Sequence, residues 1–73
     1  MRTDNYPAVG SHWKEVDPRI NRVVEVVAHD TARRKVGITR MHSIQVTWAK
    51  VERFNGKRGG YRPATPDEVA SAL

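Results

Sequence analysis

The chain of 73 residues has no cysteine, few aromatic residues and no long apolar run. Without cysteine, a disulfide framework and a thiolate metal site are excluded, which fits a reducing compartment. No apolar run approaches the roughly 20 residues that a membrane-spanning helix needs. The first residues, MRTDNYP, also lack the apolar region of a signal peptide. We therefore expect a soluble, cytoplasmic protein that does not contact a membrane.

Signatures of catalysis and of cofactor binding are missing as well. His12, His29 and His42 are too far apart in the sequence to form a local pair of metal ligands. The glycines of residues 56–60 do not form a phosphate-binding loop, and no serine lies in a nucleophile elbow. A chain of this length has room for one domain and seldom encloses a substrate cavity. We expect a protein that is not an enzyme and that holds no metal ion and no cofactor.

Acidic residues are almost absent from the middle of the chain. Residues 33–62 carry nine Lys or Arg and one Glu, a net charge of +8, whereas residues 1–32 carry −1 and residues 63–73 carry −2. A surface formed by the middle segment therefore has a field of one sign. The charge indicates an anionic partner, either a nucleic acid or an acidic protein surface. The alternative is a solvated basic surface that only keeps the protein soluble.

What the chain does contain is a series of short segments with the pattern of β-strands. Apolar side chains alternate with polar ones, or β-branched residues follow one another, and turn residues lie between the segments. We expect strands at Ser11–Val16, Arg19–Ala28, Arg33–Arg40, Ser43–Trp48 and Gly60–Pro63. The valine-rich second segment is apolar on both faces, which predicts the central strand, with a bulge or curve.

The sequence also predicts which side chains of these strands face the core. Trp13 is predicted to anchor the core or its rim, Val36 and Ile38 to face inward, and Gly37 to allow a bend or a close approach. The turn between Asp30 and Arg34 is short enough for a hairpin.

The stretch Ser43–Tyr61 holds both an alternating strand and a basic turn. Ile44, Val46 and Trp48 share one side of the strand, so we expect them in the core, although Trp48 could also stack on bases. The segment after the strand is predicted to make a short irregular or 3₁₀ turn, with Val51 and Phe54 pointing inward. Tyr61 follows two glycines and is expected to be half exposed.

A capping box marks the start of a C-terminal helix. Thr65 is followed by proline at the first helical position and by Glu68, which can reach back to the Thr65 backbone. The helix has two turns at most. We expect a flexible arm over residues 1–9, in which Tyr6 or Val9 can pack on the core, a β-barrel domain over residues 10–63, and a short helix or tail over residues 64–73.

These elements predict a mainly β fold, a small SH3-like antiparallel half-barrel of four or five strands with a short C-terminal helix. The alternative is a twisted antiparallel sheet with the helix packed on one face. The partner-binding residues are expected on the basic segment and its last turn: Arg33, Arg34, Lys35, Arg53, Lys57, Arg58, Tyr61 and Arg62.

Spaced residues between about positions 10 and 62 resemble small phage-encoded SH3-like proteins. They are Gly10 and Trp13, then Asp17-Pro18-Arg19, then Arg22, Val24 and Val26, then Trp48 to Phe54 with Arg53-Phe54, and Gly60-Tyr61-Arg62. In length and basic character the chain is also similar to a short phage protein that binds host RNA polymerase, displaces σ factor and acts as an antiterminator. The resemblance implies a regulator in the cytoplasm of a bacterial host.

The sequence is compatible with three functions. The first is a phage-type transcription regulator that binds host RNA polymerase, inhibits initiation and acts in antitermination, working as a monomer. The second is a nucleic-acid-binding barrel that contacts DNA or RNA phosphates directly. The third is a small assembly or scaffold subunit.

Overall fold

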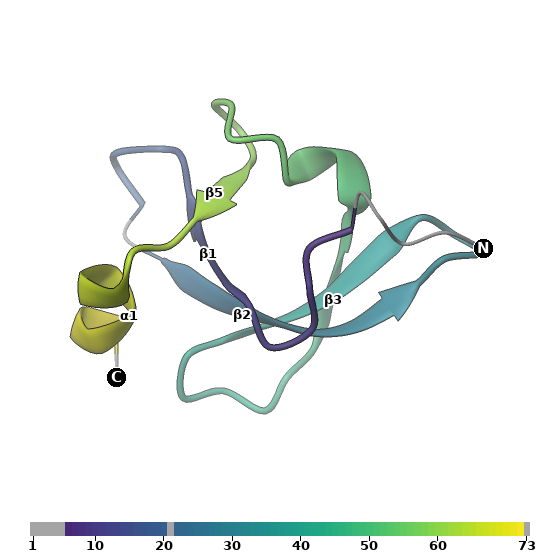
Figure 1. Ribbon diagram of the computed structural model, residues 1–73, viewed down its shortest axis with the longest axis horizontal. Coiled ribbons are helices and arrows are strands. Elements are labelled where there is room, and N and C mark those ends of the chain that lie inside the picture. Colours follow the sequence, from purple (N-terminus) through teal and green to yellow (C-terminus); the bar gives the residue numbers. More distant parts are fainter. Residues whose placement is uncertain (1–5, 21, 73) are drawn as a thin grey trace.

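The computed structural model describes residues 6–20 and 22–72, and it is built mainly from β-strands (Figure 1). Five antiparallel strands form one sheet, and a short helix follows them. The elements are β1 (His12–Glu15), β2 (Val23–Asp30), β3 (Lys35–Arg40), β4 (Thr47–Lys50), the 3₁₀ turn η1 (Val51–Arg53), β5 (Tyr61–Pro63) and α1 (Pro66–Ala72). The strand order is β4-β3-β2-β1-β5, so the sheet is not closed and β4 and β5 are its edges. The predicted SH3-like half-barrel with a C-terminal helix is confirmed.

Strand β2 lies at the centre of the sheet, as its run of valines predicts. Val24 and Val26 are buried, and their branched side chains favour the extended backbone. The pairing of β2 with β3 shifts in register between Val26 and Ala28, which is the predicted bulge. Because a bulge bends its strand and increases the local twist, it helps the sheet to curve around the core.

The core fills the concave side of this curved sheet. Its buried members are Val24, Val26, Val36, Ile38, Ala49, Val51 and Tyr61, and three aromatic side chains, Tyr6, Trp13 and Phe54, pack against them. Trp13 meets Phe54 edge to face at 5.3 Å between ring centroids, and Phe54 stacks on Tyr61 at 5.0 Å. This row of three rings joins β1, the residue after η1, and β5. The predictions for Trp13, Val51 and Phe54 are confirmed.

A hairpin joins β2 to β3, with Asp30 opposite Lys35. The Asp30 carboxylate accepts a hydrogen bond from the Arg33 backbone N–H at 3.2 Å, and Arg34 takes a positive φ of 56°. Arg33 and Arg34 therefore belong to the turn. The prediction that the strand begins at Arg33 is wrong by two residues, because the chain must turn within this segment.

The predicted strand Ser43–Trp48 is displaced, and its predicted core face is wrong. The strand runs from Thr47 to Lys50, Ala49 faces the core, and Ile44, Val46 and Trp48 are exposed. Alternation with a period of two indicates which residues share a face of the strand. It does not indicate which of the two faces is buried. The side chain of Val51 is buried, and its backbone N–H bonds to the Arg34 carbonyl at 3.0 Å, which turns Ala49 inward and Trp48 outward.

The C-terminal elements follow the prediction closely. Strand β5 is an edge strand, and its neighbour in the described sheet is β1. The Glu68 N–H donates to Thr65 Oγ1 at 3.2 Å, and the Thr65 N–H donates to Glu68 Oε1 at 2.9 Å, so the capping box is formed. The predicted last helical residue, Leu73, lies outside the described residues.

Most of the predicted N-terminal arm, residues 1–5, also lies outside the described residues. The described part of the arm contacts the domain: the Tyr6 ring lies edge to face with His29 at 5.2 Å, and His29 Nε2 lies 2.7 Å from the Pro7 carbonyl oxygen. Val9 is exposed. Across residues 6–20 and 22–72, no helix has the length and apolar character to span a membrane.

Candidate partner-binding surface

The eight residues predicted to bind a partner lie on three parts of the fold. They divide into the β2–β3 turn, the segment from η1 to β5, and β5 itself. The members are Arg33, Arg34 and Lys35 in the first group, Arg53, Lys57 and Arg58 in the second, and Tyr61 and Arg62 in the third.

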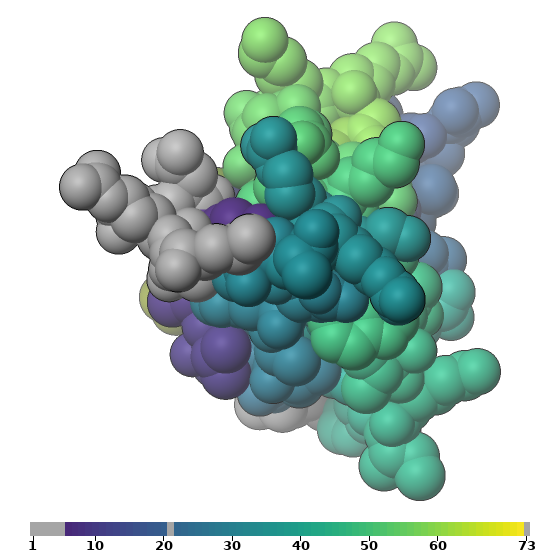
Figure 2. All heavy atoms as spheres, turned by 90° about the vertical axis from the view of Figure 1, so that its right-hand side faces the viewer, coloured from purple at the N-terminus to yellow at the C-terminus, as the bar shows by residue number. Residues whose placement is uncertain are grey.

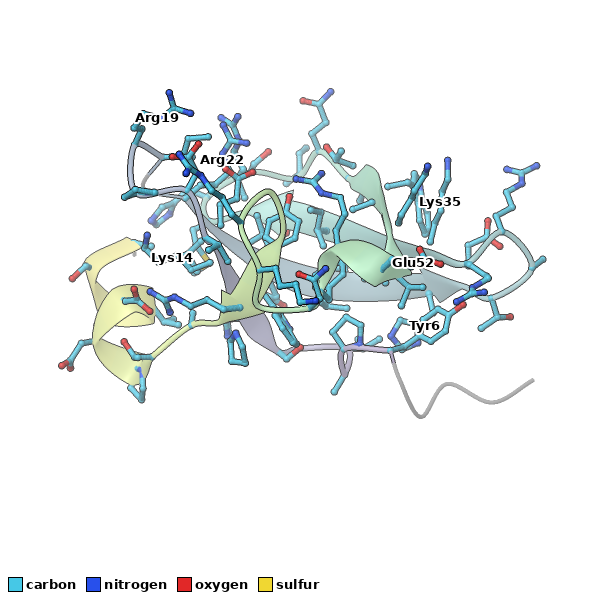
Figure 3. All side chains as sticks on the ribbon, turned by 90° about the horizontal axis from the view of Figure 1, so that it is seen from above. Tyr6, Lys14, Arg19, Arg22, Lys35 and Glu52 are labelled. Carbon is cyan, nitrogen blue, oxygen red and sulfur yellow. The ribbon has the colours of Figure 1, made fainter. Side chains whose placement is uncertain are left out.

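Several basic side chains gather around the β2–β3 turn. Arg33, Arg34 and Lys35 line a shallow hollow of about 470 Å³ together with Lys50 and Glu52. Arg34 forms an ion pair with Glu52 at 3.1 Å. Figure 2 shows this end of the molecule, with side chains of the turn projecting toward the viewer, and in Figure 3 Lys35 and Glu52 lie at one end. The structure thus brings one predicted group together and adds Lys50 to it.

The second group is partly committed to the fold. The Arg53 guanidinium lies over the Tyr61 ring at 4.9 Å from the ring centroid, and its Nε donates to the Gly59 carbonyl at 3.2 Å. Lys57 and Arg58 are exposed in the turn that follows.

Tyr61 is a core residue, and the prediction that it is half exposed is wrong. It is only 4% exposed, because β5 turns the ring inward against Phe54. Burial raises the pKa of its hydroxyl above the ordinary value.

Arg62 is held by the C-terminal helix. Its two terminal nitrogens donate to the two carboxylate oxygens of Glu68 at 2.8 and 2.6 Å. The same carboxylate closes the capping box, so Arg62 connects β5 to α1. Its guanidinium is already satisfied by an internal anion.

Trp48, which was expected in the core with stacking on bases as the alternative and is not among the eight predicted residues, is 48% exposed. Its ring covers Gly37 on the next strand: a Cβ built on Gly37 would lie 3.2 Å from the ring and 3.3 Å from Val46. The close approach predicted at Gly37 is therefore confirmed, and it is the Trp48 ring that makes it. Part of the ring therefore contacts the sheet, and part is open to solvent.

Two further exposed apolar side chains precede Trp48 at alternate positions of the chain. Val46 is 43% exposed, and Ile44, in the segment before β4, is fully exposed. Lys50 follows Trp48 on the same face, and Lys35 is the cross-strand neighbour of Lys50. We call the set Ile44, Val46, Trp48, Lys35 and Lys50 the Trp48 face.

The two lysines of the Trp48 face leave positive charge without an internal partner. Like charges directly opposite each other on paired strands are destabilising. Among the residues that the structure describes, neither Lys35 nor Lys50 forms an ion pair with a carboxylate. An external anion placed beside them would relieve this repulsion. The Trp48 face therefore combines an apolar stripe with unpaired cations.

A second hollow lies at the open end of the half-barrel. It has a volume of about 650 Å³ and is bordered by Arg22, Arg40, Thr47 and Tyr61, among others. Arg22 bonds the buried carboxylate of Glu15 at 3.3 Å, so part of its charge is neutralised internally. Within the described ranges, no group of three or more His, Asp or Glu residues could hold a metal ion.

Comparison with models of protein families, with curated proteins and with solved structures finds no match to this chain.

Proposed function

We propose that this protein is a non-enzymatic regulator of the phage type, which docks on bacterial RNA polymerase in the host cytoplasm and inhibits initiation or promotes antitermination. The observation that carries the proposal is the Trp48 face, where a half-exposed Trp48 lies in line with Val46 beside Lys50. Docking on an acidic protein surface needs both features. Aromatic anchors contribute most of the affinity, and charges steer the encounter.

The apolar stripe favours a protein partner over a purely electrostatic one. Exposed apolar side chains that lie singly are ordinary, but adjoining ones mark interaction sites. Ile44, Val46 and Trp48 are separated by one residue each, and Trp48 and Val46 both touch the Gly37 position. The choice of polymerase is supported by the resemblance of the spaced residues to phage-encoded proteins and by the basic character of the chain.

The test is retention of purified bacterial RNA polymerase on immobilised protein, followed by transcription from a promoter. We expect the wild type to retain polymerase and to lower the transcript yield. Trp48→Ala and the double change Lys35→Ala with Lys50→Ala are expected to weaken retention.

The matched control removes the same charge elsewhere, by Lys57→Ala with Arg58→Ala. These side chains are exposed in the turn before β5 and do not belong to the Trp48 face. We expect the control to retain polymerase as the wild type does. No retention by the wild type, together with an unchanged transcript yield, would refute the proposal.

Direct binding of nucleic acid is the second candidate, and the exposure of Trp48 favours it. A base can stack on an exposed aromatic ring while lysines beside it contact phosphates. Titration of labelled single strands and duplexes at two salt concentrations distinguishes this function, because binding through phosphates weakens steeply with salt. Unchanged affinity after the joint replacement of Arg33, Arg34 and Lys35 would exclude the β2–β3 turn as the contact.

A further inference from the structure

Strand β4 is an edge of the sheet, and among the described residues no strand pairs with its outer side. Resting on the docking function proposed above, we infer that the partner supplies an extended acidic segment that adds to β4 as a further strand. Strand addition of this kind takes its affinity from backbone hydrogen bonds and its specificity from alternate side chains.

The direction of the backbone groups in β4 follows from one hydrogen bond. The Val51 N–H donates to the Arg34 carbonyl at 3.0 Å, and the pairing continues in the same register with Lys50 opposite Lys35 and Ala49 opposite Val36. In an antiparallel ladder, residues that bond to the neighbouring strand alternate with residues whose N–H and C=O point away. Ala49 therefore bonds to β3, whereas Trp48 and Lys50 direct their backbone groups toward the free side.

The side chains of the Trp48 face specify what kind of strand fits there. Alternate residues of an added strand would lie beside Lys50, Trp48 and Val46 on the outer face of the sheet. Cross-strand neighbours of opposite charge, and aromatic with β-branched residues, stabilise such pairs. The fitting segment therefore has an acidic residue and a β-branched apolar residue two positions apart.

Charge selects this occupant over a second copy of the chain. A second β4 would bring another Lys50 to an edge where Lys35 and Lys50 already lie together, and the whole chain carries a net charge of +5. Lysine on an edge strand is a known protection against pairing between identical edges. An acidic segment instead meets complementary charge.

Lys50 offers a substitution that blocks the edge with little disturbance of the fold. Its φ of −65° is the value that proline imposes, and its N–H points away from β3, so no ladder hydrogen bond is lost. The preceding Ala49 is in a strand, as a residue before proline prefers. Lys50→Ala is the matched control, because it removes the same charge but keeps the N–H.

The experiment uses the capped peptide ETVTVTE, which presents Glu, Val, Val and Glu on one side in either direction of pairing. The charge-reversed control is KTVTVTK. Amide hydrogen exchange is followed by nuclear magnetic resonance at millimolar peptide. We expect ETVTVTE to slow exchange at Trp48 and Lys50, and KTVTVTK to leave it unchanged. Lys50→Pro is expected to bind ETVTVTE at least about tenfold more weakly than Lys50→Ala.

Several results would overturn the inference. They are unchanged exchange at Trp48, equal binding by Lys50→Pro and Lys50→Ala, or equal effects of the two peptides. Protection of the Trp48 amide before any peptide is added would also overturn it, because the edge would already be occupied. A single-stranded oligonucleotide that protects these amides while ETVTVTE does not would assign the edge to nucleic acid.

Retention of polymerase by the same variants is scored separately. Peptide addition at β4 without retention of polymerase refutes the proposed partner and supports the edge site. Retention that is equal for Lys50→Pro and Lys50→Ala supports the partner and refutes the edge site.

Discussion

Arg62 and Glu68 form a two-point ion pair that joins the last strand to the C-terminal helix. The distances are 2.8 and 2.6 Å, and the same Glu68 carboxylate accepts the Thr65 N–H at the helix start. One side chain therefore closes the capping box and fixes α1 to β5.

This pair makes stability depend on pH. The Arg62 guanidinium and the Thr65 N–H lower the pKa of Glu68 from 4.5 to about 2. Because the folded pKa is the lower one, the contribution of Glu68 is complete above its ordinary pKa and is lost as the pH falls toward 2. We expect the difference in thermal midpoint between the wild type and Glu68→Gln to be largest at neutral pH and to shrink as the solution is acidified. A difference that stays constant with pH would contradict this assignment.

Arg62→Ala is expected to lower stability without weakening partner binding. The substitution leaves Glu68 without its main cation, whereas the guanidinium takes no part in the Trp48 face. Thermal unfolding and retention of polymerase by the folded variant measure the two effects separately. Weaker retention of polymerase by Arg62→Ala at unchanged stability would indicate that Arg62 contacts the partner.

Tyr61 is expected to contribute more to stability than Trp48, which reverses the prediction from the sequence that Trp48 is buried and Tyr61 half exposed. Tyr61→Ala empties a core position and should cost about 3–5 kcal/mol, as buried aromatic residues do. Trp48→Ala removes a half-exposed ring and should cost at most about 2 kcal/mol. Urea denaturation of both variants checks the order, and a larger loss for Trp48→Ala would contradict the structure.

Gly60 is expected to tolerate no side chain. A Cβ at this position would overlap the Arg53 carbonyl oxygen and lie 2.9 Å from Asn55 Oδ1. Gly60→Ala should therefore cost about 1–3 kcal/mol in the free energy of unfolding. Gly59→Ala is the control, because Gly59 has a positive φ of 85° but open space around it. A smaller loss for Gly60→Ala than for Gly59→Ala would refute the steric argument.

Gly37→Ala is expected to move the Trp48 ring away from the sheet. The new methyl group would lie 3.2 Å from the ring, which is tight, and the exposed ring can shift outward. We expect the emission of Trp48 to move to longer wavelength, measured with Trp13→Phe in both proteins, and stability to change by less than about 1 kcal/mol. Unchanged emission would show that the ring does not rest on Gly37.

The sequence predicts the architecture well because its signals are local. The valine run of β2, the turn after Asp30 and the capping box at Thr65 each depend on neighbouring residues alone. Even the bulge in β2 could be predicted, since apolar residues on both sides of one strand need cover.

The candidate site is harder to predict because it depends on which side of β4 faces the core. The alternation of Ile44, Val46 and Trp48 is equally compatible with either side. The short side chain of Ala49 gave little sign that it is the buried member, although the inward prediction for Val51 has the same parity and could have indicated it. The pairing of Arg62 with Glu68 was hidden because the capping box already explained Glu68.

Lys50 is the one charged residue of β4, and it has a consequence for the protein in isolation. A free edge with exposed apolar side chains is a template for aggregation into fibrous assemblies. The ammonium group limits that growth because it repels the same group on another copy. At 0.1 M salt this repulsion is largely screened at separations greater than about 10 Å. Replacing Lys50 by an apolar residue is therefore expected to lower the solubility of the protein, because the edge would lose the charge that opposes pairing between copies.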